Sequence, residues 1–442
     1  MLGPDSAAEG PPTRNPKPET RNPRLYYGWV IVAVAALVSL SEVAIFNPVL
    51  SLFIPPMSGE LGWSRTAISL AATIAAFASG LAGPVFGPIV DRWGPRVLYT
   101  FGSVATSLSL LALAFVSSLW QFYLLFLPGR LFSQWATNAG NPVIVANWFI
   151  RQRGRAIGIT TLGTRAGMAL VPPAAQWVMD RVGWRATWQF LGVFTLVTAV
   201  LPSALLLRRR PEEMGLAPDG AVATAPVGEK VPAGSSAEPA DPFEVNWRPK
   251  EAIRTAAFWL VLAVQCQSYL VGGALNLHHI PHYIAQGLPA SEAVLALTAF
   301  AILSGVGGVL FALAAERFGV RTTLSLALLW GSLSLFVMRQ VETLPLAFVA
   351  SSLYGFGFGG MRSLGNLVWS DYFGRRSGGA IRGLTFPAEM AANSLGPLSG
   401  GIVFDLTGSY QAALLVYGLL GVSASLFMLT ARPPRRTPAV SG

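Results

Sequence analysis

Five charged residues stand inside long apolar stretches of the sequence, where charge is costly. They are Glu42, Arg130, Arg165, Arg362 and Glu389. A charged group at the centre of a bilayer costs roughly 2.5–3.5 kcal/mol on insertion scales, so each of these side chains must face protein or water. At a rise of about 1.5 Å per residue, most of them fall near the middle of their stretch. We predict that these five residues line one central cavity, in which guanidinium groups bind an anion and carboxyl groups carry protons.

The elements that position these residues are apolar segments of membrane-spanning length. The chain has 442 residues, of which 52% are hydrophobic and only 12% are charged, so a water-soluble core could not bury its apolar surface. The fold class that we predict is an all-α membrane protein with twelve transmembrane helices. The predicted spans are approximately 26–50, 66–88, 97–117, 120–148, 155–178, 183–207, 257–285, 291–315, 322–340, 345–371, 379–403 and 411–430.

The two halves of the chain repeat each other. The segment GPIVDRWGPR at 87–96 has a counterpart, ALAAERFGVR, at 312–321, in which the acidic, Arg, Gly and Arg residues recur in the same order. ANWFIRQRGRAIG at 146–158 likewise matches SDYFGRRSGGAIRG at 370–383. We therefore expect two pseudo-symmetric six-helix halves. The predicted boundaries are a disordered tail at 1–24, halves at 25–210 and 255–431, a solvated linker at 211–254 and a second tail at 432–442.

The loop pattern G-x-x-x-D-R-x-G-x-R in the first of these segments resembles the signature loop of the major facilitator superfamily. YYGWV at 26–30 and LGWSR at 61–65 resemble the bacterial members near the monocarboxylate porters and the oxalate/formate exchangers. The resemblance implies a substrate cavity lined by spans 1, 4, 7 and 10 and transport by rocking of the halves. It also implies that charged loop residues latch one conformation as gates; these are Asp91, Arg92, Arg96, Glu316, Arg317 and Arg321.

The same resemblance makes Arg130 and Arg362 the first choices for contact with an anion, with Arg165 as a third. A span-4 arginine such as Arg130 can equally hold helix ends together. In carboxylate-carrying relatives an arginine stands two turns before the acidic residue of the second loop, and here that place is Gly308. Either Arg362 or Arg165 has taken over that role, or the substrate is not a simple monocarboxylate.

Glu42 and Glu389 are the predicted proton-coupling residues. We expect ion pairs within each half, Glu42 with Arg165 and Arg362 with Glu389. In this hypothesis a substrate carboxylate displaces a glutamate from its arginine, which raises the pKa of the glutamate and lets it take up a proton. Substrate and proton would then move together.

The three histidines lie near the outer end of span 7, in LHHIPHY. The spacing of His278 and His282 puts two imidazoles on one helix face, as a metal site would need, but no third ligand is evident. A polar outer gate is the better functional interpretation, and simple placement at the membrane interface is the alternative. We predict no metal site. Cys266, the single cysteine, excludes an intramolecular disulfide and suits inert packing.

The charge distribution predicts the orientation in the membrane. Of the 31 Lys and Arg residues, 24 fall in the tails and even-numbered connections, which the positive-inside rule assigns to the cytoplasm. We therefore expect a multi-pass protein of the inner or plasma membrane with an uncleaved first span and both termini inside. The net basic charge then needs no nucleic-acid partner.

These features together predict a secondary active transporter that moves a small organic anion, coupled to protons or to a counter-substrate. We expect a monomer in the lipid bilayer without a cofactor. No phosphate-binding loop, nucleophile constellation or metal quartet points to an enzyme. Two alternatives remain, a multidrug exporter that exchanges lipophilic compounds for protons and a permease-like sensor that binds without transport.

Overall fold

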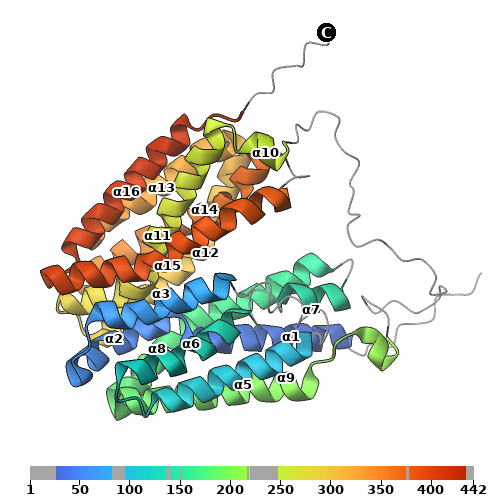
Figure 1. The fold of residues 1–442 in the computed structure, drawn as a ribbon, viewed down its shortest axis with the longest axis vertical. Helices are drawn as coiled ribbons and strands as arrows, with labels where there is room; N and C mark the ends of the chain where they lie inside the picture. Colours follow the sequence, from blue (N-terminus) through green and yellow to red (C-terminus); the bar gives the residue numbers. More distant parts are fainter. Residues whose placement is uncertain are drawn as a thin grey trace, which may run out of the picture.

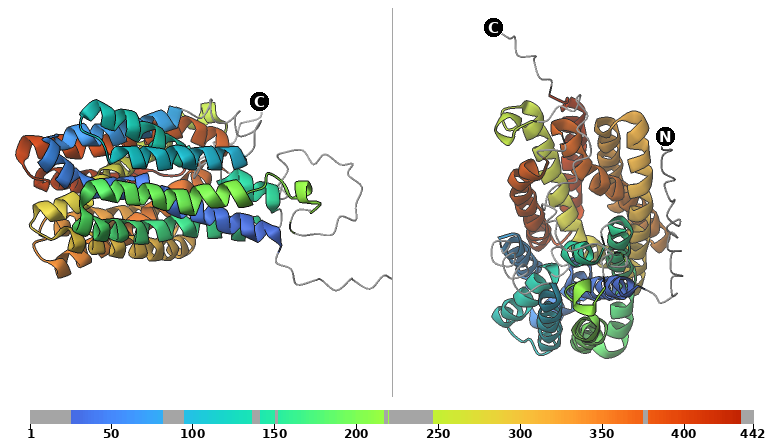
Figure 2. Two further views of the ribbon diagram at one scale, coloured as in Figure 1. Left: turned by 90° about the horizontal axis from the view of Figure 1, so that it is seen from below. Right: turned by 90° about the vertical axis from the view of Figure 1, so that its right-hand side faces the viewer.

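The computed structural model describes residues 26–81, 95–135, 141–149, 152–216, 219, 247–374 and 378–434. These residues form helices joined by short connections, and no strand occurs among them. Figure 1 shows two helical bundles, one built from the blue-to-green N-terminal half and the other from the yellow-to-red C-terminal half. In Figure 2 the helices of both bundles run roughly side by side. Many large apolar side chains on these helices are exposed, as a surface in contact with lipid requires.

The N-terminal half begins with a long apolar segment that is interrupted once. Its elements are α1 (Tyr27–Ser41), the 3₁₀ helix η1 (Glu42–Ile45), α2 (Asn47–Leu61), α3 (Arg65–Leu81), α5 (Pro95–Leu113), α6 (Leu119–Trp135), α7 (Asn141–Trp148), α8 (Arg153–Thr195), the π-helical η3 (Leu196–Val200), α9 (Leu201–Leu206) and η4 (Pro211–Met214). The first span therefore continues to Leu61, beyond the predicted end near residue 50. Pro48 lies in the first turn of α2, where a missing backbone N–H costs no helical hydrogen bond, so the chain resumes its helix there.

Two predicted spans follow each other directly within α8 and are separated by a sharp break at Gly183. The segment Arg155–Leu206 has 52 residues, which would extend about 78 Å as a straight helix, more than twice the hydrocarbon core of a bilayer. Gly183, with φ 79°, breaks the helical conformation within α8. A residue with a side chain rarely adopts this φ, so glycine allows the tight reversal here.

The C-terminal half consists of regular helices. They are α10 (Pro249–Ala252), α11 (Ala256–Ala285), α12 (Ala290–Phe318), α13 (Val320–Met338), α14 (Leu344–Phe373), α15 (Gly378–Thr407) and α16 (Gln411–Thr430). Seven of the described helical segments in the two halves are long and apolar enough to cross a membrane. Glycines allow close helix contact, as where Gly307 of α12 meets the backbone of Phe356 and Gly359 of α14 meets that of Ser304.

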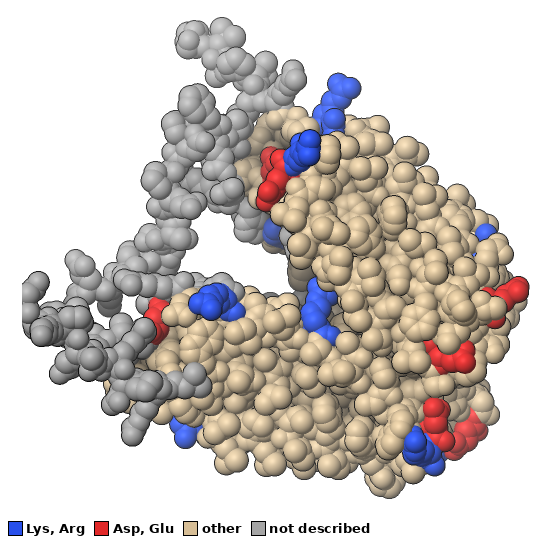
Figure 3. Space-filling view, turned by 180° about the vertical axis from the view of Figure 1, so that it is seen from behind, with Lys and Arg blue, Asp and Glu red and all other residues tan. Residues whose placement is uncertain are grey.

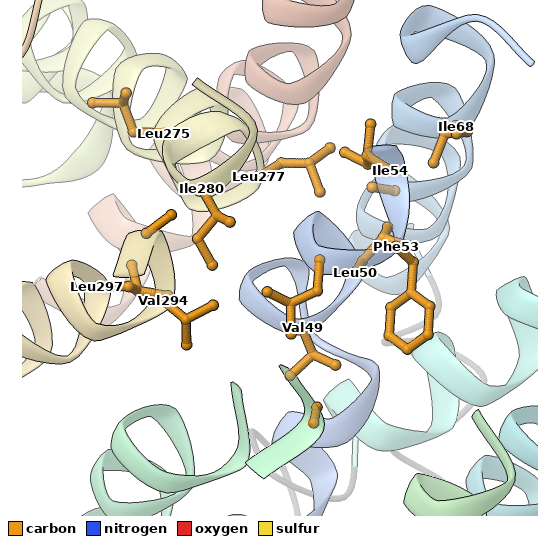
Figure 4. Close-up of a cluster of buried hydrophobic side chains, with 14 of the residues drawn as sticks. Val49, Leu50, Phe53, Ile54, Ile68, Leu275, Leu277, Ile280, Val294 and Leu297 are labelled. Atoms are coloured by element: carbon orange, nitrogen blue, oxygen red, sulfur yellow. The ribbon is translucent and has the colours of Figure 1, made fainter. Parts of the chain in front are cut away.

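The two halves meet at one end of the molecule and separate at the other. The largest cluster of buried apolar side chains draws on both halves (Figure 4), with Val49, Leu50, Phe53 and Ile54 of α2 near Leu277 and Ile280 of α11 and Val294 and Leu297 of α12. The two other clusters belong to one half each. Figure 3 shows a hollow between the halves that is open to one side. We call the end with α2, the start of α3 and the end of α15 the closed end, and the opposite one the open end.

Candidate functional site

Two arginines from opposite halves are exposed and interact electrostatically with each other. Arg165 lies on α8 and Arg362 on α14, and the positive charge of Arg362 acts on Arg165. Neither guanidinium forms a hydrogen bond or an ion pair in the described part of the chain. The Cζ atom of Arg362 lies 4.8 Å from the ring centroid of Tyr269 on α11. Basic side chains are visible at the wall of the hollow in Figure 3. Two unpaired cations between the halves can bind an anion.

Arg130 lies apart from this pair, within the N-terminal half. It is only 9% exposed, and its Cζ atom lies 4.3 Å from the ring centroid of Phe46, at the junction of η1 and α2. Its Nε and Nη1 atoms are buried and have no hydrogen-bond partner among the described residues. Glu42 is the carboxyl group whose charge acts on Arg130. The structure thus brings together two of the three predicted anion-binding arginines.

Glu42 is completely buried at the point where α1 gives way to η1. Its carboxyl group accepts hydrogen bonds from the hydroxyl groups of Ser103 (2.9 Å) and Thr106 (3.2 Å), both on α5. The predicted ion pair with Arg165 is therefore wrong. The carboxyl group is turned toward α5, whose hydroxyl groups satisfy it inside the half, while Arg165 is exposed.

Glu389 is also completely buried, and its ion-pair partner is on its own helix. Nη1 of Arg382 lies 2.5 Å from Oε1 of Glu389, and Oε2 is buried without a hydrogen bond in the described structure. The predicted pair of Glu389 with Arg362 is wrong. Residues seven apart lie two turns apart on one face of a helix, so Arg382 reaches the carboxyl group along α15 without a second helix. Arg362 packs instead on Tyr269.

The described residues of the predicted gating loops lie at the open end. Asp91 and Arg92 are outside the described residues. Nη2 of Arg96, at the start of α5, donates to the carbonyl oxygen of Ala204 in α9 (2.8 Å), a contact within one half. The second loop has Glu316 and Arg317 exposed at the end of α12, and Arg321 follows on α13. None of these four described side chains bonds to the other half, so gating by them stays a prediction.

His278 lies at the contact between the halves. Its Nε2 is 2.7 Å from the carbonyl oxygen of Pro397, so this nitrogen carries the proton, and Nδ1 then accepts from the hydroxyl group of Tyr410 (3.0 Å). Nε2 is also 3.4 Å from the hydroxyl oxygen of Ser69 on α3, in the other half. His282 points inside its own half, where Nε2 donates to the carbonyl oxygen of Met338 (3.0 Å). Among the described residues no group of His, Cys, Asp or Glu could hold a metal ion.

One set of polar contacts between the halves was not predicted from the sequence. The carboxylate of Asp405, near the end of α15, accepts the backbone N–H groups of Arg65 (3.1 Å) and Thr66 (2.8 Å) at the start of α3. The guanidinium of Arg65 donates to the hydroxyl group of Tyr410 (2.8 Å), and its Cζ lies 3.5 Å from the ring centroid of Phe404. Arg65 belongs to the LGWSR segment, which indicated only a family resemblance. Nothing in the sequence indicated that this segment contacts Asp405.

Sequence and structure comparisons agree on the class of protein. A sequence model described as the Major Facilitator Superfamily matches residues 32–286 and 268–442, which is most of the chain. The chain belongs to the major facilitator superfamily. Monocarboxylate transporter 11 of Mus musculus is 27% identical over 436 residues, covering 93% of this chain and 89% of that protein. The uncharacterized MFS-type transporter YcxA of Bacillus subtilis is 23% identical over 384 residues, covering 82% and 85%.

Solved structures of major facilitator transporters share this fold. A bacterial homologue of the human lysosomal transporter Spinster, described as inward-facing and occupied, superposes with a TM-score of 0.66 at 16% identity, over 94% of this chain and 98% of that one. A variant of the nucleoside transporter NupG gives 0.69 at 12% identity, over 91% and 99%. The predicted fold of twelve helices in two halves is confirmed. The chain is a multi-pass membrane transporter and not an enzyme.

Gly308, the position at which the sequence departs from the superfamily pattern, lies where α12 contacts α14. A Cβ atom at this position would lie 2.9 Å from the hydroxyl oxygen of Ser363, the residue after Arg362 on α14. A side chain here would first have to displace this hydroxyl group, which lies at the contact of α12 with α14. The place of the missing arginine is therefore a close helix contact in this major facilitator, and Arg362 is the arginine that the facing helix carries beside it.

Proposed function

We propose that this protein is a secondary active transporter that moves a small, monocarboxylate-like organic anion by alternating access. The observation that carries the proposal is the pair of exposed guanidiniums, Arg165 and Arg362, which come from opposite halves, repel each other and have no carboxylate partner among the described residues. A carboxylate bound between them relieves the repulsion and gains charge-assisted hydrogen bonds from both halves. The curated relative from Mus musculus, named as a monocarboxylate transporter, supports this substrate class.

The revised pairings change the expected binding step. Because Arg165 and Arg362 are not paired with glutamates, an incoming anion does not have to displace a carboxylate from them. The binding step therefore needs no proton, and coupling, where it occurs, takes place at Glu42 or Glu389. Protonation of Glu389 would remove its charge and release Arg382 from the ion pair. Proton binding could in this way alter the conformation of α15.

Alternating access follows from the way the halves make contact. We propose that the open end faces the cytoplasm, because the basic residues Arg208, Arg209, Arg210 and Arg254 lie at that end of the bundles. The closed end is then the outer gate, made of the apolar cluster and the polar contacts of Arg65 with Asp405 and of His278 with Ser69. His282 packs next to this gate, where its ring lies edge-to-face with the ring of Tyr410 at a centroid distance of 6.1 Å. Rocking of the halves must break these contacts.

Uptake into proteoliposomes tests the proposal. Purified protein should accumulate radiolabelled lactate or another short carboxylate, and Arg165→Ala and Arg362→Ala should each lower uptake at least tenfold. Arg185→Ala is the matched control, because Arg185 is a half-buried arginine of the same helix, α8, that pairs with Glu60 at the closed end (2.9 Å). A panel of cationic dyes run in parallel separates an anion carrier from a multidrug exporter. Absence of any flux, with binding retained, would identify a sensor and refute transport.

A further inference from the structure

We propose that Tyr269 is a positioning residue, which holds the guanidinium of Arg362 in the orientation that binds the substrate anion. This inference rests on the proposed function, in which Arg362 contacts the anion. The Cζ atom of Arg362 lies 4.8 Å from the Tyr269 ring centroid, within the range of a cation–π interaction. In the described structure this ring is the partner of a guanidinium that otherwise has no hydrogen bond or ion pair.

The packing of α11 against α14 fixes where Tyr269 lies. One turn before Tyr269, the buried amide of Gln265 donates to the carbonyl oxygen of Gly365 (2.8 Å), about one turn beyond Arg362. A Cβ atom on Gly365 would lie 2.7 Å from Nε2 of Gln265, so the two helices are in close contact at this point. The ring of Tyr269 is therefore presented by a helix backbone held in register and not by a loop.

A second set of contacts fixes the same register farther along the two helices. The ring nitrogen Nε2 of His279 lies 3.0 Å from the hydroxyl oxygen of Ser351, and the hydroxyl group of Tyr283 lies 2.9 Å from the same oxygen. The pairs 265 with 365, 269 with 362 and 279 with 351 follow one antiparallel register. A slip that moved Tyr269 away from Arg362 would break buried hydrogen bonds on both sides of it.

A cation–π contact with a ring uses none of the hydrogen-bond donors of a guanidinium. The π face of tyrosine accepts the positive charge and forms no conventional hydrogen bond, so the five N–H donors of Arg362 stay available for a carboxylate. The half-buried Tyr269 thus restricts the motion of an exposed side chain without neutralising it. Arg130 offers a contrast, because it also lies over a ring, that of Phe46, but is itself buried beside Glu42.

The test compares Tyr269→Leu, which removes the ring, with Tyr269→Phe, which keeps it. For uptake of radiolabelled lactate into proteoliposomes, we expect Tyr269→Leu to raise KM about three- to thirty-fold with little change in kcat. This corresponds to about 0.7–2 kcal/mol at 1.4 kcal/mol per tenfold. Tyr269→Phe should stay within about twofold of the parent protein. A role in packing alone would lower the amount of folded protein and kcat without this selective change in KM.

A second readout does not depend on transport. Phenylglyoxal modifies arginine side chains, and mass spectrometry can follow the reaction at Arg362 in purified protein. Tyr269→Leu should raise the modification rate severalfold, because the ring that contacts the guanidinium is removed, whereas Tyr269→Phe should not. Unchanged KM and unchanged modification in Tyr269→Leu would overturn this inference. If Arg362→Ala still abolishes uptake in that case, the proposed function stands; if Arg362→Ala transports normally, the proposed function itself fails.

Discussion

The carboxylate of Asp405 joins the two halves at the closed end, and its removal should open that end. Asp405 accepts the N–H groups of Arg65 and Thr66 at the start of α3, so a residue from the C-terminal half caps a helix of the N-terminal half. Loss of a capping side chain costs about 0.5–2 kcal/mol, and loss of a negative charge at a helix N-terminus about 0.3–1 kcal/mol. Asp405→Ala should therefore destabilise the closed end by about 1–2 kcal/mol, which shifts the open-to-closed ratio about 5–30-fold.

Cysteine labelling can measure this shift. In a background in which the single natural cysteine is changed by Cys266→Ser, Leu50→Cys places a thiol in the apolar cluster of the closed end, where the leucine is completely buried. Purified protein in lipid nanodiscs is reacted with a maleimide, and the labelling rate is compared with and without Asp405→Ala. We expect the rate to rise about 5–30-fold, in proportion to the population in which the closed end is open.

The control for this experiment is Glu60→Ala. Glu60 also forms a contact at the closed end, with Arg185, but both residues belong to the N-terminal half, so the rate should not change. Equal labelling in Asp405→Ala and its parent, with both proteins folded by gel filtration, would refute the role of Asp405 in holding the halves together. An equal rise in Glu60→Ala would point to general loosening and refute it as well.

Three further outcomes are expected. Arg165→Ala should weaken binding of short carboxylates, measured as loss of the thermal stabilisation they give, while Arg185→Ala keeps it; equal loss in both would contradict a local effect. Glu389→Gln should retain lactate exchange but lose lactate-driven acidification of liposomes that contain a pH-sensitive dye, because the amide cannot take up the proton; wild-type acidification would exclude Glu389 as the coupling group. Gly307→Leu should lower the thermal midpoint by several degrees, because its side chain would collide with the backbone of α14, whereas Gly305→Leu, with no atom within 4 Å of its Cβ position, should not; equal midpoints would disprove close packing of α12 on α14.

The sequence by itself determined the class and the fold. Each apolar segment must satisfy its own backbone hydrogen bonds in lipid, so transmembrane helices can be recognised one at a time from local composition. The repeat of 87–96 at 312–321 then gave the division into two halves. Charged residues within apolar segments could also be recognised from the sequence, because the cost of burying a charge depends on the segment that carries it. The ion-pair partners predicted for Glu42 and Glu389 were nevertheless wrong.

Only the tertiary structure decided which partners these groups have. Asp405 and Arg65 are 340 positions apart and meet because the halves close on each other at one end. Arg165 and Arg362, from opposite halves, come within electrostatic range of each other, while Glu389 pairs with Arg382 of its own helix. The rotation of each helix about its axis and the register of its neighbours set these pairings. Helix rotation and register depend on contacts along whole helix faces, such as the glycine contacts of α12 with α14. They cannot be predicted from any short stretch of sequence.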